Sequence, residues 1–121
     1  MTLHPEQLAL KIVEALDNKK AEDIEALNIR NISFLTDYFV ICSGNSTVQV
    51  KALADTVEEK LMELGYHPAH KEGYSSASWI LLDYGEVVVH IFYHEARSFY
   101  KLERLWSDAP RLDIQSIINR V

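Results

Sequence analysis

The chain has 121 residues, of which 48% are hydrophobic and 25% charged, a composition typical of a globular protein. Its net charge of -6 disfavours direct nucleic-acid binding, because contacts to phosphates need a basic surface, and leaves a basic protein partner compatible. A single cysteine, Cys42, excludes an internal disulfide. The sequence has no signal peptide and no apolar run near the ~20 residues of a membrane span, so we expect a cytoplasmic protein that does not bind membranes.

The first half of the chain alternates between helical and strand patterns. Pro5 suits the first turn of a helix, apolar residues then recur at helical spacing, and Gly65 is the expected end of a second helix. Residues 37–42 are almost continuously apolar, so this strand should be covered on both faces and lie centrally in a sheet. The expected elements are a helix over 5–18, a strand around 24–29, a strand over 37–42, a turn over 43–46 and a helix over 47–64.

Two β-branched runs on either side of residues 84–85 give the strongest hairpin signal in the chain. A two-residue loop there would place Trp79 opposite His90 and Asp83 opposite Glu86. One face of this hairpin is entirely aliphatic and should lie in the core, whereas the other mixes large apolar and ionisable side chains. The aliphatic face comprises Ile80, Leu82, Val87, Val89 and Ile91; the mixed face comprises Trp79, Leu81, Asp83, Glu86, Val88, His90 and Phe92.

The remaining segments complete the predicted fold. An edge strand is expected within 66–73, because Pro68 cannot donate a hydrogen bond in an interior strand. After the hairpin, residues 95–106 predict an amphipathic helix, and 113–121 predict a short helix docked on the domain or on a partner. The order α-β-β-α-β-β-β-α predicts an α/β (α+β) fold with a mixed sheet of about five strands and helices mainly on one face.

The loop Ser43-Gly44-Asn45-Ser46 lies between a strand and a helix, where helix N–H groups could hold a phosphate. Known cap preferences favour a simpler interpretation, in which Ser46 or Asn45 caps the helix. Neither a Walker pattern nor a G-x-G-x-x-G motif is present, and no carboxylate pair follows the loop on a strand to hold two metal ions. A nucleotide-binding or nucleotidyltransferase-type enzyme using this loop is therefore the alternative and not the leading hypothesis.

Other reactive side chains give equally weak signals. His67 and His70 have a spacing loosely like that of metal ligands, as do His90 and His94, but on a strand the first pair would point to opposite faces. Cys42 lies within an apolar strand without a nearby histidine, which indicates a core thiol and not a nucleophile. We expect neither a metal nor a cofactor.

The mixed face of the hairpin favours binding over catalysis. Its apolar strip around Trp79 is rimmed by Asp83 and Glu86, and a tryptophan with an ionic rim is typical of an interaction surface. A helix of the same chain, such as 95–106, lying over this face would give the same pattern. The residues alone leave these two interpretations open.

Five stretches carry a resemblance to a known family: 17–24; 36–46 with Gln49-Val50; Glu72-Gly73; 79–85 with Val89-His90; and 97–106. In this order they resemble the ribosomal silencing factor family, the RsfS or Iojap-like proteins of bacteria and organelles. They span about residues 10–107, so we expect a single Iojap-like domain over 1–107 and a C-terminal tail over 108–121, onto which nothing is carried.

The resemblance implies a domain related in fold to nucleotidyltransferases but without their catalytic carboxylates, and hence not an enzyme. Family members bind the large ribosomal subunit through its fourteenth protein, obstruct joining of the small subunit and so repress translation when nutrients are scarce. Homodimers also occur in the family, which leaves self-association open here. The resemblance implies partner-binding roles for Trp79, Asp83, His90, Arg97, Tyr100 and Glu103, with Trp79 as a desolvated anchor and Asp83 paired with a lysine or arginine.

Overall fold

The computed structural model describes residues 3–100 and 108–118, with the side chains of 98–100 left out. Five strands form one mixed sheet in the order β1-β2-β5-β4-β3, in which β2 and β5 are parallel and the other pairs antiparallel. This confirms the predicted mixed sheet of about five strands. The elements are α1 (Pro5–Asn18), β1 (Glu22–Asn28), β2 (Tyr38–Gly44), α2 (Thr47–Glu63), β3 (His70–Glu72), β4 (Trp79–Asp83), β5 (Val87–Tyr93), α3 (His94–Tyr100) and α5 (Gln115–Ile118).

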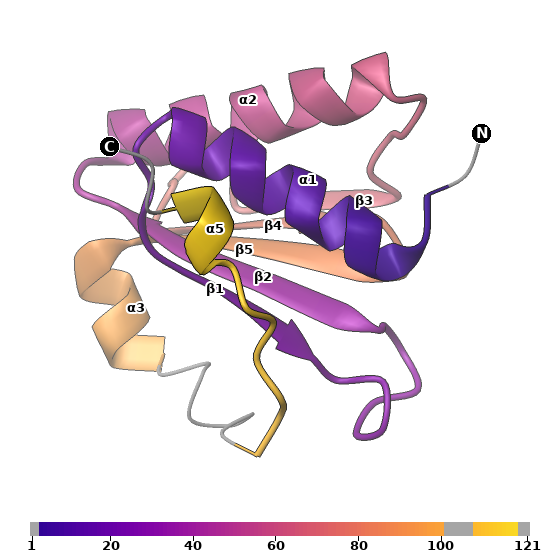
Figure 1. Cartoon of the computed structure of the whole chain (residues 1–121). Coiled ribbons are helices and arrows are strands. Elements are labelled where there is room, and N and C mark those ends of the chain that lie inside the picture. The colour runs from indigo at the N-terminus through magenta and orange to yellow at the C-terminus, as the bar shows by residue number, and fades with distance from the viewer. Residues whose placement is uncertain (1–2, 101–107, 119–121) are drawn as a thin grey trace.

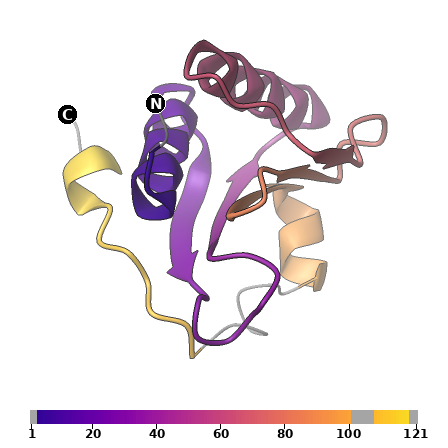
Figure 2. The same ribbon diagram turned by 90° about the vertical axis from the view of Figure 1, so that its right-hand side faces the viewer.

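The helices divide unequally between the two faces of the sheet. Helices α1 and α2 lie side by side across one face and α5 rests against α1, whereas α3 lies on the opposite face, against β2 and β5 (Figures 1 and 2). The described helices therefore cover one face much more fully than the other. The less covered face is the one that carries the mixed side of the hairpin.

The main core lies between α1, α2 and the sheet. The whole aliphatic face of the hairpin points into it, and all five of its side chains are fully buried, as predicted. Burying one such side chain contributes about 1.5–3 kcal/mol. Helix α1 adds its apolar stripe, whose buried members are Leu8, Ala9, Ile12, Val13, Ala15 and Leu16.

The register of the hairpin differs from the prediction. Trp79 lies opposite Phe92, and not His90, and Asp83 lies opposite Val88, and not Glu86, because the connection has three residues, 84–86. The carbonyl of Glu86 accepts hydrogen bonds from the N–H groups at 37 and 38 and so points toward the start of β2, while its N–H donates to the carbonyl of Tyr84 within the connection. Since the shift is two residues, each side chain keeps its predicted face.

Other predicted elements match the structure with small changes. Strand β2 is interior, but β5 occupies the centre of the sheet, because it pairs in parallel with β2 and antiparallel with β4. Strand β3 lies at the edge, after Pro68, as expected. The predicted helix over 95–106 is seen as α3 up to Tyr100, and its remainder lies outside the described residues.

The C-terminal segment runs back along the domain. Leu112 donates its N–H to Ala26 and Pro110 accepts from Asn28, so this segment adds backbone hydrogen bonds to the edge of β1 before α5 contacts α1. The predicted domain boundary at residue 107 falls outside the described residues. Within residues 3–100 and 108–118, none of the helices combines the length and apolar character that crossing a membrane requires.

Candidate functional site

Among the residues that the structure describes, the mixed face of the hairpin is only partly covered. Phe92 is fully buried in a small cluster that includes Ala96 of α3, and His90 is 4% exposed. Toward β4 the cover ends, and Trp79, Leu81 and Asp83 are all half-buried. Each of the two interpretations of this face therefore describes part of it: a helix of the same chain covers one side, and a half-open strip remains along β4.

Trp79 is held in a defined orientation at the border of this strip. Its Nε1–H donates a hydrogen bond to Nδ1 of His90 over 3.1 Å, and its indole stacks on Phe92 with ring centroids 5.0 Å apart. A half-exposed tryptophan fixed from two sides loses little side-chain freedom when a partner covers it. This arrangement suits an anchor for a binding partner.

His90 helps to hold the indole of Trp79 in place. Burial lowers the pKa of its imidazole from 6.5 to about 4, so the ring is neutral near pH 7. Because Nδ1 accepts the bond from Trp79, the proton lies on Nε2, a buried atom without a hydrogen-bond partner among the described residues. With 4% of the residue exposed, the geometry favours a role in positioning Trp79 over direct contact with a partner.

Asp83 lies where β4 ends and the hairpin turns. Its Oδ1 accepts a hydrogen bond of 2.8 Å from the N–H of Gly85, whose φ of +86° suits glycine. The half-buried carboxylate of Asp83 and the exposed Glu86 place two negative charges at this end of the hairpin. A basic group of a partner could pair with them.

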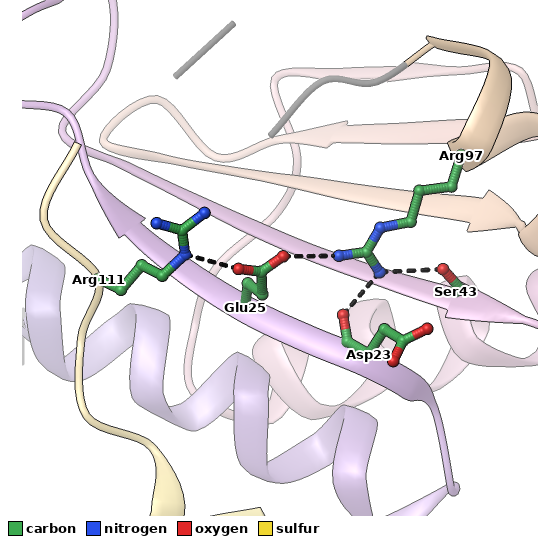
Figure 3. A network of polar contacts seen from close by, with 5 residues as sticks. All are labelled: Asp23, Glu25, Ser43, Arg97 and Arg111. Atoms are coloured by element: carbon green, nitrogen blue, oxygen red, sulfur yellow. Dashed lines mark hydrogen bonds and ion pairs between the residues drawn. The ribbon is translucent and has the colours of Figure 1, made fainter. Parts of the chain in front are cut away.

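Arg97 is the centre of a polar network beneath α3 (Figure 3). It is 8% exposed, and its guanidinium donates to the carbonyl of Asp23 over 2.6 Å, to Oγ of Ser43 over 2.9 Å and to Oε2 of Glu25 over 2.9 Å. The other oxygen of Glu25 accepts from Nε of Arg111 over 2.6 Å. Arg97 therefore joins α3 to β1 and β2, and Glu25 joins α3 to the C-terminal segment.

A bulge in β1 shapes this network. The pairing of β1 with β2 shifts between Glu22 and Glu25, and Asp23 has a φ of +50°, a conformation that few residues other than glycine adopt. The carbonyl of Asp23 accepts from Arg97 there. The strained backbone and the buried guanidinium thus support one another.

Two further residues of the predicted site cannot be placed in this way. Tyr100 ends α3, but its side chain lies outside the described residues, as does the whole of Glu103. Among the others, the structure brings Trp79 and His90 into contact, places Asp83 at the end of the hairpin, and buries Arg97 beneath α3.

The partners of Arg97 escaped the sequence analysis. Glu25 and Ser43 lie 72 and 54 residues away from it, and no local pattern links them. Phe34 and Leu35, in the loop between β1 and β2, were not predicted to be functional either; they are 108% and 91% exposed. The sequence did indicate this exposed pair, because two adjacent large apolar residues stand between two predicted strands.

The loop that follows β2 caps a helix. Oγ of Ser46 accepts from the N–H of Gln49 over 3.0 Å, and Oε1 of Gln49 accepts from the N–H of Asn45 over 2.7 Å. In this reciprocal arrangement, side-chain oxygens occupy the backbone N–H groups that could otherwise bind a phosphate. It confirms the cap interpretation.

The remaining reactive groups offer little chemistry. Cys42 is fully buried, and burial raises the pKa of its thiol to about 12, so the nucleophilic thiolate is scarce near pH 7. Within the described ranges, no three or more His, Cys, Asp or Glu side chains lie together in a way that could hold a metal ion.

Comparison with known proteins decides the family. A family model described as "Ribosomal silencing factor during starvation" matches residues 2–121. The chain belongs to this family. Ribosomal silencing factor RsfS of Bacillus subtilis is 46% identical over 112 residues, covering 92% of this chain and 95% of that protein. RsfS of Halalkalibacterium halodurans is 43% identical over 114 residues, covering 94% of this chain and 97% of that protein.

Solved structures agree with this assignment. A crystal structure of protein CV0518 from Chromobacterium violaceum superposes with a TM-score of 0.84 at 35% identity, covering 87% of this chain and 88% of that one. A crystal structure from Bacillus halodurans gives a TM-score of 0.80 at 42% identity, covering 89% of this chain and 98% of that one. The RsfS family, which includes the Iojap proteins, consists of ribosome-binding factors without enzymatic activity.

Proposed function

We propose that the chain binds the large ribosomal subunit through its fourteenth ribosomal protein, blocks joining of the small subunit sterically, and so represses translation in nutrient limitation. Family membership supports ribosome binding, and one structural observation carries the choice of surface. Trp79 is fixed by His90 and Phe92, yet remains half-exposed at the border of a strip that no described helix covers. Binding hot spots are commonly tryptophans in such settings.

The charges at the end of the hairpin fit the proposed partner. Ribosomal proteins are basic, and Asp83 and Glu86 stand beside the strip in a chain whose net charge is -6. A shielded, charge-assisted pair between Asp83 and a lysine or arginine would contribute about 1.5–3 kcal/mol. Trp79 would supply the apolar anchor, and Asp83 the orientation.

The other predicted site residues take supporting or peripheral roles. His90 holds the indole of Trp79, and Arg97 holds α3 against the sheet at the side of the strip. Tyr100, the last residue of α3, and Glu103, which lies outside the described residues, stay as proposed contacts. The tail over 108–121, of which the structure describes 108–118, contacts α1 through α5 and has no role in this proposal.

Three finer points complete the proposal. From family membership we infer a nucleotidyltransferase-like fold without the catalytic carboxylates, and the helix-capping role of Ser46 argues against a phosphate site in its loop. We place the action in the cytoplasm, where bacterial ribosomes work. Self-association through the mixed face is the competing use of this surface, and the experiment below separates it.

Sedimentation with purified large subunits tests the proposal. The wild-type chain should sediment with the subunits, and the double variant Trp79→Ala, Asp83→Arg should bind at least about 30-fold more weakly, as expected when a hot spot worth about 2 kcal/mol is lost. Glu59→Arg, an exposed charge reversal on α2, is the matched control and should bind like the wild type.

Two results would contradict this assignment. Undiminished binding by the double variant would exclude the mixed face as the ribosome-binding surface. Light scattering that shows wild-type dimers and variant monomers, with equal affinity for the subunit, would assign the face to self-association instead.

A further inference from the structure

The loop between β1 and β2 presents large apolar side chains to solvent. Phe34 is 108% exposed, Leu35 is 91% exposed and Ile32 is 47% exposed, and the loop extends beyond the ends of the two strands that it joins (Figure 1). Contiguous exposed apolar groups of this kind mark interaction sites in soluble proteins.

Hydrogen bonds fix the shape of this loop. The N–H of Ile29 donates to the carbonyl of Asp37 over 2.8 Å and closes the loop at its base, and the carbonyl of Ile29 accepts from Ser33. Oγ of Ser33 accepts from the N–H of Leu35 over 3.1 Å. The exposed apolar pair therefore sits on an internally hydrogen-bonded loop, which loses little further conformational entropy when a partner binds.

A hollow of about 580 Å³ lies beside the apolar pair. Leu8 of α1 lines it together with Phe34 and Leu35, and Asp37 and Glu86 bring two carboxylates to it. The described lining residues include no lysine, arginine or histidine, so the hollow is negatively charged.

A buried hydroxyl in the same hollow lacks a partner. Thr36 is 7% exposed and lines the hollow, and its Oγ1 has no hydrogen-bond partner among the described residues. A buried hydroxyl left unpaired is unfavourable, and a ligand group that bonds to it removes this penalty. An ammonium or guanidinium could donate to this oxygen while it pairs with the two carboxylates.

We propose that this loop and hollow form a second docking surface, which takes a basic protein segment of the large ribosomal subunit. An apolar side chain of the segment would pack on Phe34 and Leu35, and its lysine or arginine would enter the hollow between Asp37 and Glu86. The inference rests on the proposed function and extends it, because Glu86 belongs to the hairpin connection that directly follows Asp83.

Charge selects this occupant over the alternatives. RNA would bring phosphates toward two carboxylates, and a second copy would bring its own net charge of -6. A basic protein segment gains from the same charges.

Equilibrium binding of purified large subunits tests the inference. The double variant Phe34→Ser, Leu35→Ser should bind about tenfold more weakly than the wild type, with an unchanged unfolding transition, because both side chains lie in solvent. Val48→Ser, on α2, removes another apolar side chain that is 76% exposed and should bind like the wild type.

A second variant identifies the partner. Asp37→Asn, which leaves Asp83 and Glu86 beside the strip unchanged, should weaken binding and reduce its salt dependence if the occupant is basic. Tighter binding by this variant would instead indicate RNA and overturn the inference.

The outcomes separate the two proposals. If the wild type binds and the serine variant binds large subunits equally tightly, the second surface alone is overturned. The same holds if the serine variant loses self-association but keeps its affinity for the subunit. A wild-type chain that fails to bind large subunits overturns the proposed function, and this inference with it.

Discussion

Acid should destabilise this protein through His90. In the folded chain, burial holds the pKa of this imidazole at about 4, whereas in the unfolded chain it titrates near 6.5. Between these values the unfolded chain binds a proton at this site and the folded chain does not. Lowering the pH through this window therefore favours unfolding, and above pH 6.5 the stabilising effect is fully present.

The size of the effect follows from the two pKa values. A difference of about 2.5 pH units, at about 1.4 kcal/mol per unit, lowers the free energy of unfolding by about 3 kcal/mol between pH 7 and pH 4. This is a large share of the roughly 5–15 kcal/mol that stabilise a typical domain. Protonation would also turn Nδ1 from an acceptor into a donor and break its bond to Trp79.

Urea unfolding at a series of pH values measures this contribution. His90→Asn retains an oxygen that can accept from the indole of Trp79 but removes the titrating ring. Its stability should be lower than that of the wild type at pH 7, and the difference should shrink as the pH falls to 4. His67→Asn, at an exposed position, is the control and should follow the wild-type profile.

A constant difference between wild type and His90→Asn from pH 7 to pH 4 would refute this reasoning. So would an imidazole that NMR titration shows to gain its proton near pH 6.5 in the folded chain. Either result would mean that water reaches the ring and that burial does not keep this histidine neutral in the folded chain.

Three further substitutions or reagents test individual contacts. Arg97→Lys should lower the free energy of unfolding by about 1–3 kcal/mol in urea, since an ammonium cannot match the forked guanidinium toward its three acceptors; an unchanged value would refute the network. Ser46→Ala should cost about 1 kcal/mol in the same assay by removing the cap of α2, whereas Ser46→Asn should cost much less. Cys42 should react with a thiol reagent only as fast as the chain unfolds, because it is buried and its thiol pKa is raised; rapid labelling of the native chain would contradict this.

Local sequence patterns predicted the elements because those patterns are set by burial. The helix that begins at Pro5 and the aliphatic face around Leu82 were predicted correctly, since periodicity reports which side meets the core. The hairpin register was predicted wrongly. It depends on Glu86, whose carbonyl accepts from the N–H groups at 37 and 38, at the start of β2 and almost 50 positions earlier in the chain. No local pattern carries that information.

The candidate site divides in the same way. Alternation placed Trp79 and His90 on one face, and they lie there in contact. It could not show that Ala96 of α3 packs against the cluster around Phe92 while Trp79 stays half-exposed, because cover depends on where a later helix docks. The burial of Arg97 was equally hidden, since its acceptors come from strands far earlier in the chain.

A subunit-joining assay tests the central claim most directly. Purified large and small subunits are mixed with the chain, and their association is followed by light scattering. The wild-type chain and Glu59→Arg should both suppress joining, and Trp79→Ala with Asp83→Arg should restore it at the same concentration. If the double variant suppresses subunit joining as strongly as the wild type, a silencing surface centred on Trp79 is contradicted.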